Sequence, residues 1–138
     1  MKKRILVVED NLLNLELVTD LLEADGFVVC QARAAEEAFR AVRELAPDLI
    51  LMDLSLPGLD GLAATRALRA DPATHHLTII ALTAHAMKGD EAIALDAGCD
   101  GYLSKPIDTR TFVAKVAAFI ANANSRLTEP RSACQYGN

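Results

Sequence analysis

The sequence predicts an α/β fold in which five helices cover both faces of a doubly wound, five-stranded parallel sheet. Two observations support this prediction. Short apolar runs recur along the chain, and segments with the periodicity of amphipathic helices lie between them. The connections are only a few residues long, as in proteins whose helices cross over between parallel strands. At 138 residues, the chain is long enough for one such domain with a single core.

Five segments are predicted to be strands. Four are apolar runs of a length typical of strands buried on both faces, and the last is shorter. In chain order they are Arg4–Val8, Phe27–Ala32, Asp48–Met52, Thr78–Leu82 and Gly101–Leu103.

Each of the first three helices is predicted from an apolar face. The first helix should end at Asp25-Gly26, and Pro47 cannot continue the second. The predicted faces are Leu13, Leu17 and Leu21 with Val18 and Leu22 in the first helix, Ala38, Val42 and Leu45 with Phe39 in the second, and Leu62, Thr65 and Leu68 in the third.

The last two helices differ in how much apolar surface they offer. The segment "TAHAMKGDEAIALDAG" carries Gly89 and has only Ile93, Leu95 and alanines to bury, so we expect a weakly anchored helix. The final helix has a clear face of Phe112, Val113, Val116, Phe119 and Ile120, and Asp108 or Thr109 is its predicted N-cap. We expect one domain over residues 1–121 and a disordered tail over 122–138, where apolar periodicity is lost.

Composition excludes several classes of protein. The net charge of −5 gives no footprint for direct binding to nucleic acid or to an anionic membrane, and no apolar run is long enough to span one. The basic start "MKKR" leads to Glu9 and Asp10 too soon for a signal peptide. Cys30, Cys99 and Cys134 form no paired motif, so we expect a cytoplasmic protein without disulfides or zinc.

Polar residues follow four of the five predicted strands. Parallel sheets bind ligands outside the carboxyl ends of their strands, so these residues should converge on one edge. Glu9 and Asp10 follow the first strand, Asp53 the third, Thr83 the fourth and Lys105 the fifth, whereas the second offers nothing comparable.

The convergence of three carboxylates indicates a cation site. Two like charges 4 Å apart repel by roughly 4 kcal/mol at an effective dielectric constant near 20. The carboxylates must therefore raise a pKa, recruit Lys105 or bind a cation. An oxygen-only set favours Mg²⁺, or Mn²⁺ in its place, and argues against zinc. Each of these residues also has an ordinary structural explanation. The acids could begin a helix or a turn, Thr83 could be a plain strand-end residue, and Lys105 could be a surface charge. Their joint placement at the ends of neighbouring strands favours a cation site.

With these residues in this order, the sequence resembles the receiver domain of bacterial two-component response regulators. The match runs from Lys3 to Ala121 and rests on "VVEDN", "LILMDLSLPGLDG", "ALTA" and "YLSKP" in that order. The segment "TAHAMKGDE" is further similar to the DivK-type group of single-domain regulators. The resemblance implies a flavodoxin-like strand order of 2-1-3-4-5.

The family's site residues carry over onto matching positions. The resemblance implies that Asp53 is the phosphoacceptor and that Asp10 binds Mg²⁺ directly. Glu9 would act through water, and the backbone carbonyl of Ser55 would be a further ligand. Thr83 and Lys105 would contact the phosphoryl oxygens.

Further positions concern switching and phosphate lifetime. The resemblance implies that Tyr102 is a switch aromatic responding to Thr83 and that Ser55 and His85 tune how fast phosphate is lost. It also implies a cis Lys105–Pro106 bond. An isolated loop histidine is more often solvated, so His85 also fits a plain surface role, and we expect His75 and His76 on the surface.

The resemblance implies a signalling domain rather than an enzyme. Its partners would be a sensor histidine kinase or histidine phosphotransferase and a downstream protein target. The latter would bind the surface of the fourth helix, fifth strand and last helix, and the chain would be a monomer or weak dimer. A flavodoxin-like carrier is disfavoured because the acidic "EDNLLN" would repel a phosphate. An aspartate-dependent phosphatase usually carries D-x-D after its first strand, where this chain has Glu9-Asp10-Asn11. A receiver that works without phosphorylation typically lacks the acceptor or the lysine, and this chain keeps both.

Overall fold

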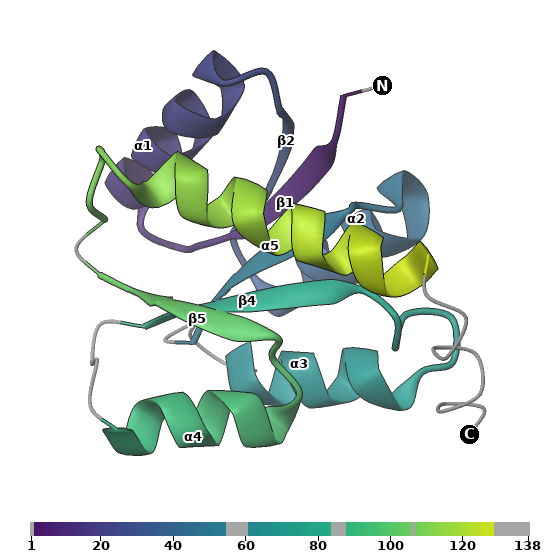
Figure 1. The fold of residues 1–138 in the computed structure, drawn as a ribbon. Coiled ribbons are helices and arrows are strands. Elements are labelled where there is room, and N and C mark those ends of the chain that lie inside the picture. Colours follow the sequence, from purple (N-terminus) through teal and green to yellow (C-terminus); the bar gives the residue numbers. More distant parts are fainter. Residues whose placement is uncertain (1, 55–60, 84–87, 106, 129–138) are drawn as a thin grey trace.

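The structure is a computed structural model that describes residues 2–54, 61–83, 88–105 and 107–128, except for the side chains of 88–91 and 123–128 (Figure 1). Ten elements alternate along the chain. They are β1 (Arg4–Val8), α1 (Leu12–Ala24), β2 (Val28–Ala32), α2 (Ala35–Leu45), β3 (Leu49–Asp53), α3 (Gly61–Ala70), β4 (Thr78–Thr83), α4 (Lys88–Ala97), β5 (Gly101–Ser104) and α5 (Phe112–Thr128). The strands pair in parallel in the order β2-β1-β3-β4-β5, which confirms the predicted fold.

The sheet separates two apolar clusters, one on each face. Alternate residues of β3 supply them: Ile50 and Met52 belong to the cluster beneath α2, α3 and α4, whereas Leu49 and Leu51 belong to the cluster beneath α1 and α5. Figure 1 shows α1 and α5 on one side of the sheet and α3 and α4 on the other. Because β3 is buried along its whole length, a polar group at its end is held by a rigid strand.

Helix α1 buries only part of the face predicted for it, and Leu21 of that face is half-buried against the core. Leu15, Val18 and Leu22 are buried, whereas Leu13 is 78% exposed and Leu17 is 37% exposed. The spacing 15-18-22 defines one face of a helix, and Leu13 and Leu17 project from another. The prediction of Leu13 and Leu17 as core residues was therefore wrong, while Val18 and Leu22 are confirmed.

The other helices follow their predicted faces more closely. Ala38 and Val42 of α2 are buried and Phe39 is half-buried, whereas Leu45, predicted to lie on the same buried face, is 37% exposed. The helix ends at Ala46, which has a left-handed conformation (φ 47°). In α3, Thr65 and Leu68 are buried as predicted, and Ala64 is buried where Leu62 is only half-buried. In α5, Phe112, Val116 and Ile120 are buried and Val113 and Phe119 pack against them.

Both ends of α5 differ from the prediction. Asp108 caps the turn before the helix, since its Oδ1 accepts the Arg110 amide at 3.0 Å and its carbonyl accepts the Phe112 amide at 2.9 Å. The helix itself begins only at Phe112, so Thr109 is not its N-cap. It continues to Thr128 rather than ending at Ala121, because extending a formed helix costs far less than starting one. The remaining predicted tail, 129–138, lies outside the described residues.

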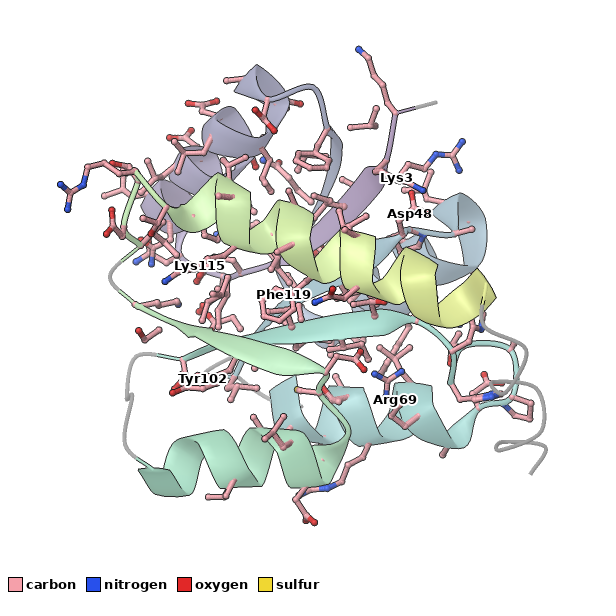
Figure 2. All side chains as sticks on the ribbon, viewed as in Figure 1. Lys3, Asp48, Arg69, Tyr102, Lys115 and Phe119 are labelled. Carbon is pink, nitrogen blue, oxygen red and sulfur yellow. The ribbon has the colours of Figure 1, made fainter. Side chains whose placement is uncertain are left out.

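A cluster around Arg69 ties α3, α4 and two strands together at the amino ends of β4 and β5, and Figure 2 labels this residue. Its guanidinium donates to the carbonyls of His75, Leu77 and Gly98 and pairs with Asp100 at 2.7 Å. Asp100 Oδ2 also accepts the Ile79 amide at 2.8 Å. These bonds satisfy main-chain groups at the edge of the sheet opposite Asp53.

Among the described helices, none has the length and hydropathy that crossing a lipid bilayer requires.

Candidate functional site

The predicted site residues lie together at the carboxyl edge of the sheet. Glu9 follows β1, Asp53 ends β3, Thr83 ends β4 and Lys105 follows β5. In the parallel pairing, Asp53 lies beside Leu82 and Thr83 lies beside Ser104, so the carboxyl ends of these strands are level with one another. Three of the four side chains are buried in full: Glu9 and Asp53 are each 1% exposed and Thr83 is 5% exposed.

Lys105 forms the charged centre of this edge. Its Nζ lies 2.8 Å from Glu9 Oε1 and 3.3 Å from Asp53 Oδ2, and its side chain is 17% exposed. Both carboxylates are otherwise removed from water, so a single ammonium group pairs with two buried acids. Recruitment of Lys105, one of the three outcomes expected of the crowded carboxylates, is thus present in the structure.

This crowding perturbs the titration of two groups. Burial raises the pKa of Glu9, and hydrogen bonding with Asp53 raises it further, against the opposing effects of Lys105 and the Asn11 amide. Burial alone would lower the pKa of Lys105, but its hydrogen bond with Glu9 and the charge of Asp53 outweigh that effect and raise it. The site therefore favours a charged lysine and disfavours a full set of charged acids.

Glu9, Asp10 and Asp53 have the composition of a site for a hard cation. Each can offer a carboxylate oxygen, and the three oxygens lie within 4.8 Å of one another. Glu9 Oε1 is buried and pairs with the Lys105 ammonium at 2.8 Å. An all-oxygen set of this kind fits Mg²⁺ or Mn²⁺.

Local main-chain bonds hold this acidic cluster in place. Glu9 Oε2 accepts the Asn11 amide at 3.1 Å, and Asn11 in turn caps α1 by accepting the Asn14 amide at 3.1 Å. On the other side of the cluster, Gly61 at the start of α3 packs so closely that a Cβ there would overlap the carbonyl oxygen of Asp53. The main chain around both acids is therefore tightly constrained.

The remaining predicted residues divide into those described and those not. Tyr102 is half-buried on β5 and packs against the cluster beneath α2, α3 and α4; Figure 2 labels it beside α4. Ser55, His85 and Pro106 lie outside the described residues, and so does the predicted cis bond. His75 and His76 are exposed, as expected. Cys99 is buried, where burial raises the pKa of its thiol, and Cys30 is half-buried.

One cation that was not predicted lies near the site. Arg33 directly follows β2, and its Nη2 lies 3.5 Å from the carbonyl oxygen of Asp10. The prediction that the end of β2 offers no comparable residue was therefore wrong. The signal was available, because the rule that ligands bind beyond the ends of parallel strands applies to β2 as well.

Comparison with known proteins identifies the class that this fold and site define. The family model of the response regulator receiver domain matches residues 5–117, and the chain belongs to that family. The particular similarity is to DivK: the chain is 43% identical over 123 residues to the polar-differentiation response regulator DivK of Brucella ovis, covering 89% of this chain and all of that protein.

Solved structures agree with this assignment. The receiver domain of a sensor histidine kinase from Pseudomonas aeruginosa, solved with a magnesium ion coordinated in its active-site cleft, is 36% identical with a TM-score of 0.79, over 88% of this chain and 99% of that one. A response regulator from Thermotoga maritima is 26% identical with a TM-score of 0.79, again over 88% and 99%.

Proposed function

We propose that Asp53 accepts a phosphoryl group from a phosphohistidine of a sensor kinase or histidine phosphotransferase in a Mg²⁺-dependent reaction. The observation that carries the proposal is the group around Asp53: a lysine ammonium at 3.3 Å and two further carboxylates whose oxygens lie within 4.8 Å of its own. A buried aspartate surrounded in this way can act as a nucleophile toward an anionic donor, because the local cations offset the donor's charge.

In the proposed step, an Asp53 carboxylate oxygen attacks phosphorus as the P–N bond to the donor imidazole breaks. The imidazole leaves with the electron pair and takes up a proton. Lys105 pairs with the phosphoryl oxygens and Thr83 donates a hydrogen bond to them. Bound Mg²⁺ would supply positive charge against the phosphoryl oxygens, with Asp10, Asp53 and the Ser55 carbonyl as direct ligands and Glu9 acting through water.

The direct test is labelling with a small phosphodonor. The chain is incubated with Mg²⁺ and acetyl phosphate, and intact mass and peptide mapping follow the gain of one phosphoryl group. We expect Asp53→Asn to abolish labelling and Asp20→Asn, at an exposed position on α1, to leave it unchanged. Full labelling of the Asp53→Asn chain at another residue would contradict the assignment. Loss of labelling on chelation of Mg²⁺ is also expected.

We further propose that the phosphorylated chain signals through the surface of α4, β5 and α5. The described side chains of α4 that are buried are only Ala94 and Ala97, whereas Ile93 and Leu95 are 47% and 46% exposed. A helix held by alanines can shift at low cost, and its exposed apolar residues can meet a downstream protein. Thr83 would move toward the phosphoryl group, and Tyr102 would turn into the space released.

Amide hydrogen exchange with and without phosphodonor tests this switch. Protection should change across α4 and β5, and Thr83→Ala should remain phosphorylated while losing most of that change. If α4 and β5 show equal protection in both states, the signal must leave the domain elsewhere. Ala118→Ser, at an exposed position on α5, provides a control that touches neither Thr83 nor Tyr102.

A further inference from the structure

The carboxyl end of β2 brings the fifth strand of the sheet into the edge that carries the site. Val8 pairs with Ala32, and the Glu9 amide donates to the Ala32 carbonyl at 2.9 Å. Arg33, the next residue, is therefore level with Glu9 and Asp10 at the end of the neighbouring strand. Its own amide donates to Glu37 Oε1 at 2.9 Å, which fixes its main chain against the first turn of α2.

The side chain of Arg33 extends toward the acidic loop. Its Nη2 lies 3.5 Å from the Asp10 carbonyl oxygen, and the residue is exposed. The peptide of Asp10 is thus held from two directions, by Arg33 at its carbonyl and by the bond from the following amide to Glu9 Oε2. Both contacts act on the residue that presents the most exposed of the three carboxylates.

The charge balance explains why a cation matters there. Glu9, Asp10 and Asp53 carry three negative charges when ionised, and Lys105 compensates one while it is engaged with Glu9 and Asp53 in the interior. A phosphodonor is itself an anion and approaches from solvent. An exposed guanidinium beside Asp10 is therefore positioned to attract it, and the planar fork of arginine matches two phosphoryl oxygens.

We propose that Arg33 is a positioning residue for the incoming phosphodonor, and that the same positive charge weakens Mg²⁺ binding at the neighbouring carboxylates. This inference rests on the proposed phosphoacceptor function. It requires the two effects to have opposite signs: removing the charge should tighten Mg²⁺ and slow phosphorylation. A residue that only held the loop in shape would weaken both together.

The Mg²⁺ measurement needs no phosphodonor. Isothermal titration of Mg²⁺ into the metal-free chain should give about two- to fivefold tighter binding for Arg33→Gln at low salt, because a nearby exposed charge interacts at that strength. Arg33→Lys keeps the charge and should bind Mg²⁺ as the unsubstituted chain does. At about 0.5 M NaCl the difference should largely disappear, since the Debye length falls to a few ångströms.

The donor measurement uses acetyl phosphate below saturation at saturating Mg²⁺. We expect the rate of Asp53 labelling to fall about three- to tenfold in Arg33→Gln and by less in Arg33→Lys, which keeps the charge but not the planar fork. Arg40→Gln removes an equal charge from an exposed position on α2 and should change neither quantity. Circular dichroism and urea unfolding check that all variants fold alike.

The outcomes separate this inference from the proposed function. If the unsubstituted chain is labelled but Arg33→Gln matches it in both measurements, or loses both Mg²⁺ affinity and rate, the role of Arg33 is refuted and Asp53 stands. If the unsubstituted chain binds Mg²⁺ but is not labelled, the phosphoacceptor function and the donor role of Arg33 both fall. If it binds no Mg²⁺, the metal site and this inference are overturned together.

Discussion

Replacing Lys105 with methionine should destabilise the metal-free chain and tighten its binding of Mg²⁺. The substitution keeps an unbranched apolar stem and removes the ammonium group that lies 2.8 Å from Glu9 and 3.3 Å from Asp53. At an effective dielectric constant near 20, these distances correspond to gross attractions of about 6 and about 5 kcal/mol. Loss of one partner from a buried pair is observed to cost about 3–5 kcal/mol.

The expected loss is smaller than that range because the acids can respond. The raised pKa of Glu9 allows it to take up a proton when the lysine is absent, and the Lys105 side chain is 17% exposed. We therefore expect about 2–3 kcal/mol of lost unfolding free energy in urea, measured in a chelator near neutral pH. Lys115→Met, at an exposed lysine of α5, should change stability by less than about 0.5 kcal/mol.

Mg²⁺ provides the second half of this test. Without the ammonium, the two buried carboxylates lose a competitor for the ion, so calorimetric Mg²⁺ affinity should rise at least about threefold. Saturating Mg²⁺ should then recover part of the lost stability, because a ligand that binds only the folded state stabilises it. A Lys105→Met chain that is as stable as the original, or that binds Mg²⁺ more weakly, would refute this account of the site's electrostatics.

Three further predictions concern packing and titration in the metal-free chain. Gly61→Ala should cost about 1–3 kcal/mol in urea unfolding and slow labelling of Asp53, because its Cβ would overlap the Asp53 carbonyl; unchanged stability would contradict the close packing. Because the pKa of Glu9 is raised on folding, the folded chain binds a proton at Glu9 more tightly than the unfolded chain does. The free energy of unfolding of the metal-free chain should therefore fall as pH rises from the ordinary glutamate pKa through the raised one. Glu9→Gln should flatten this fall, and an unchanged slope of stability against pH would contradict the role of Glu9. Leu15→Ala should cost about 2–5 kcal/mol and Leu13→Ala less than about 0.5 kcal/mol, a contrast that equal losses would negate.

The sheet and its acidic edge were predictable because each depends on the order in which apolar runs and polar strand-end residues occur in the sequence. Apolar runs and strand-end residues such as Asp53 and Lys105 reveal where strands stop, and parallel pairing then brings those ends together. Helix faces were less predictable. In α1 apolar residues occur on more than one side, so periodicity alone could not separate the buried Leu15 from the exposed Leu13.

The direction of long side chains was also hard to predict. Arg33 directly follows a strand, as do the residues of the proposed site, but a single arginine has no sequence pattern that separates a site contact from ordinary surface charge. Which direction such a side chain takes depends on neighbours such as Glu37 and the Asp10 carbonyl, and these meet it only after folding. The continuation of α5 to Thr128 likewise depends on propagation from a packed helix rather than on local periodicity.

The Arg69 cluster bears on how freely the acidic edge can vary between related proteins. Its bonds join α3, α4, β4 and β5 through groups that do not include Glu9, Asp53 or Lys105. One end of the sheet is thus secured by Arg69, Asp100 and main-chain carbonyls, all apart from the acids. On the proposed function, a substitution at the acidic edge can change metal affinity or phosphorylation rate without breaking any of these distant contacts.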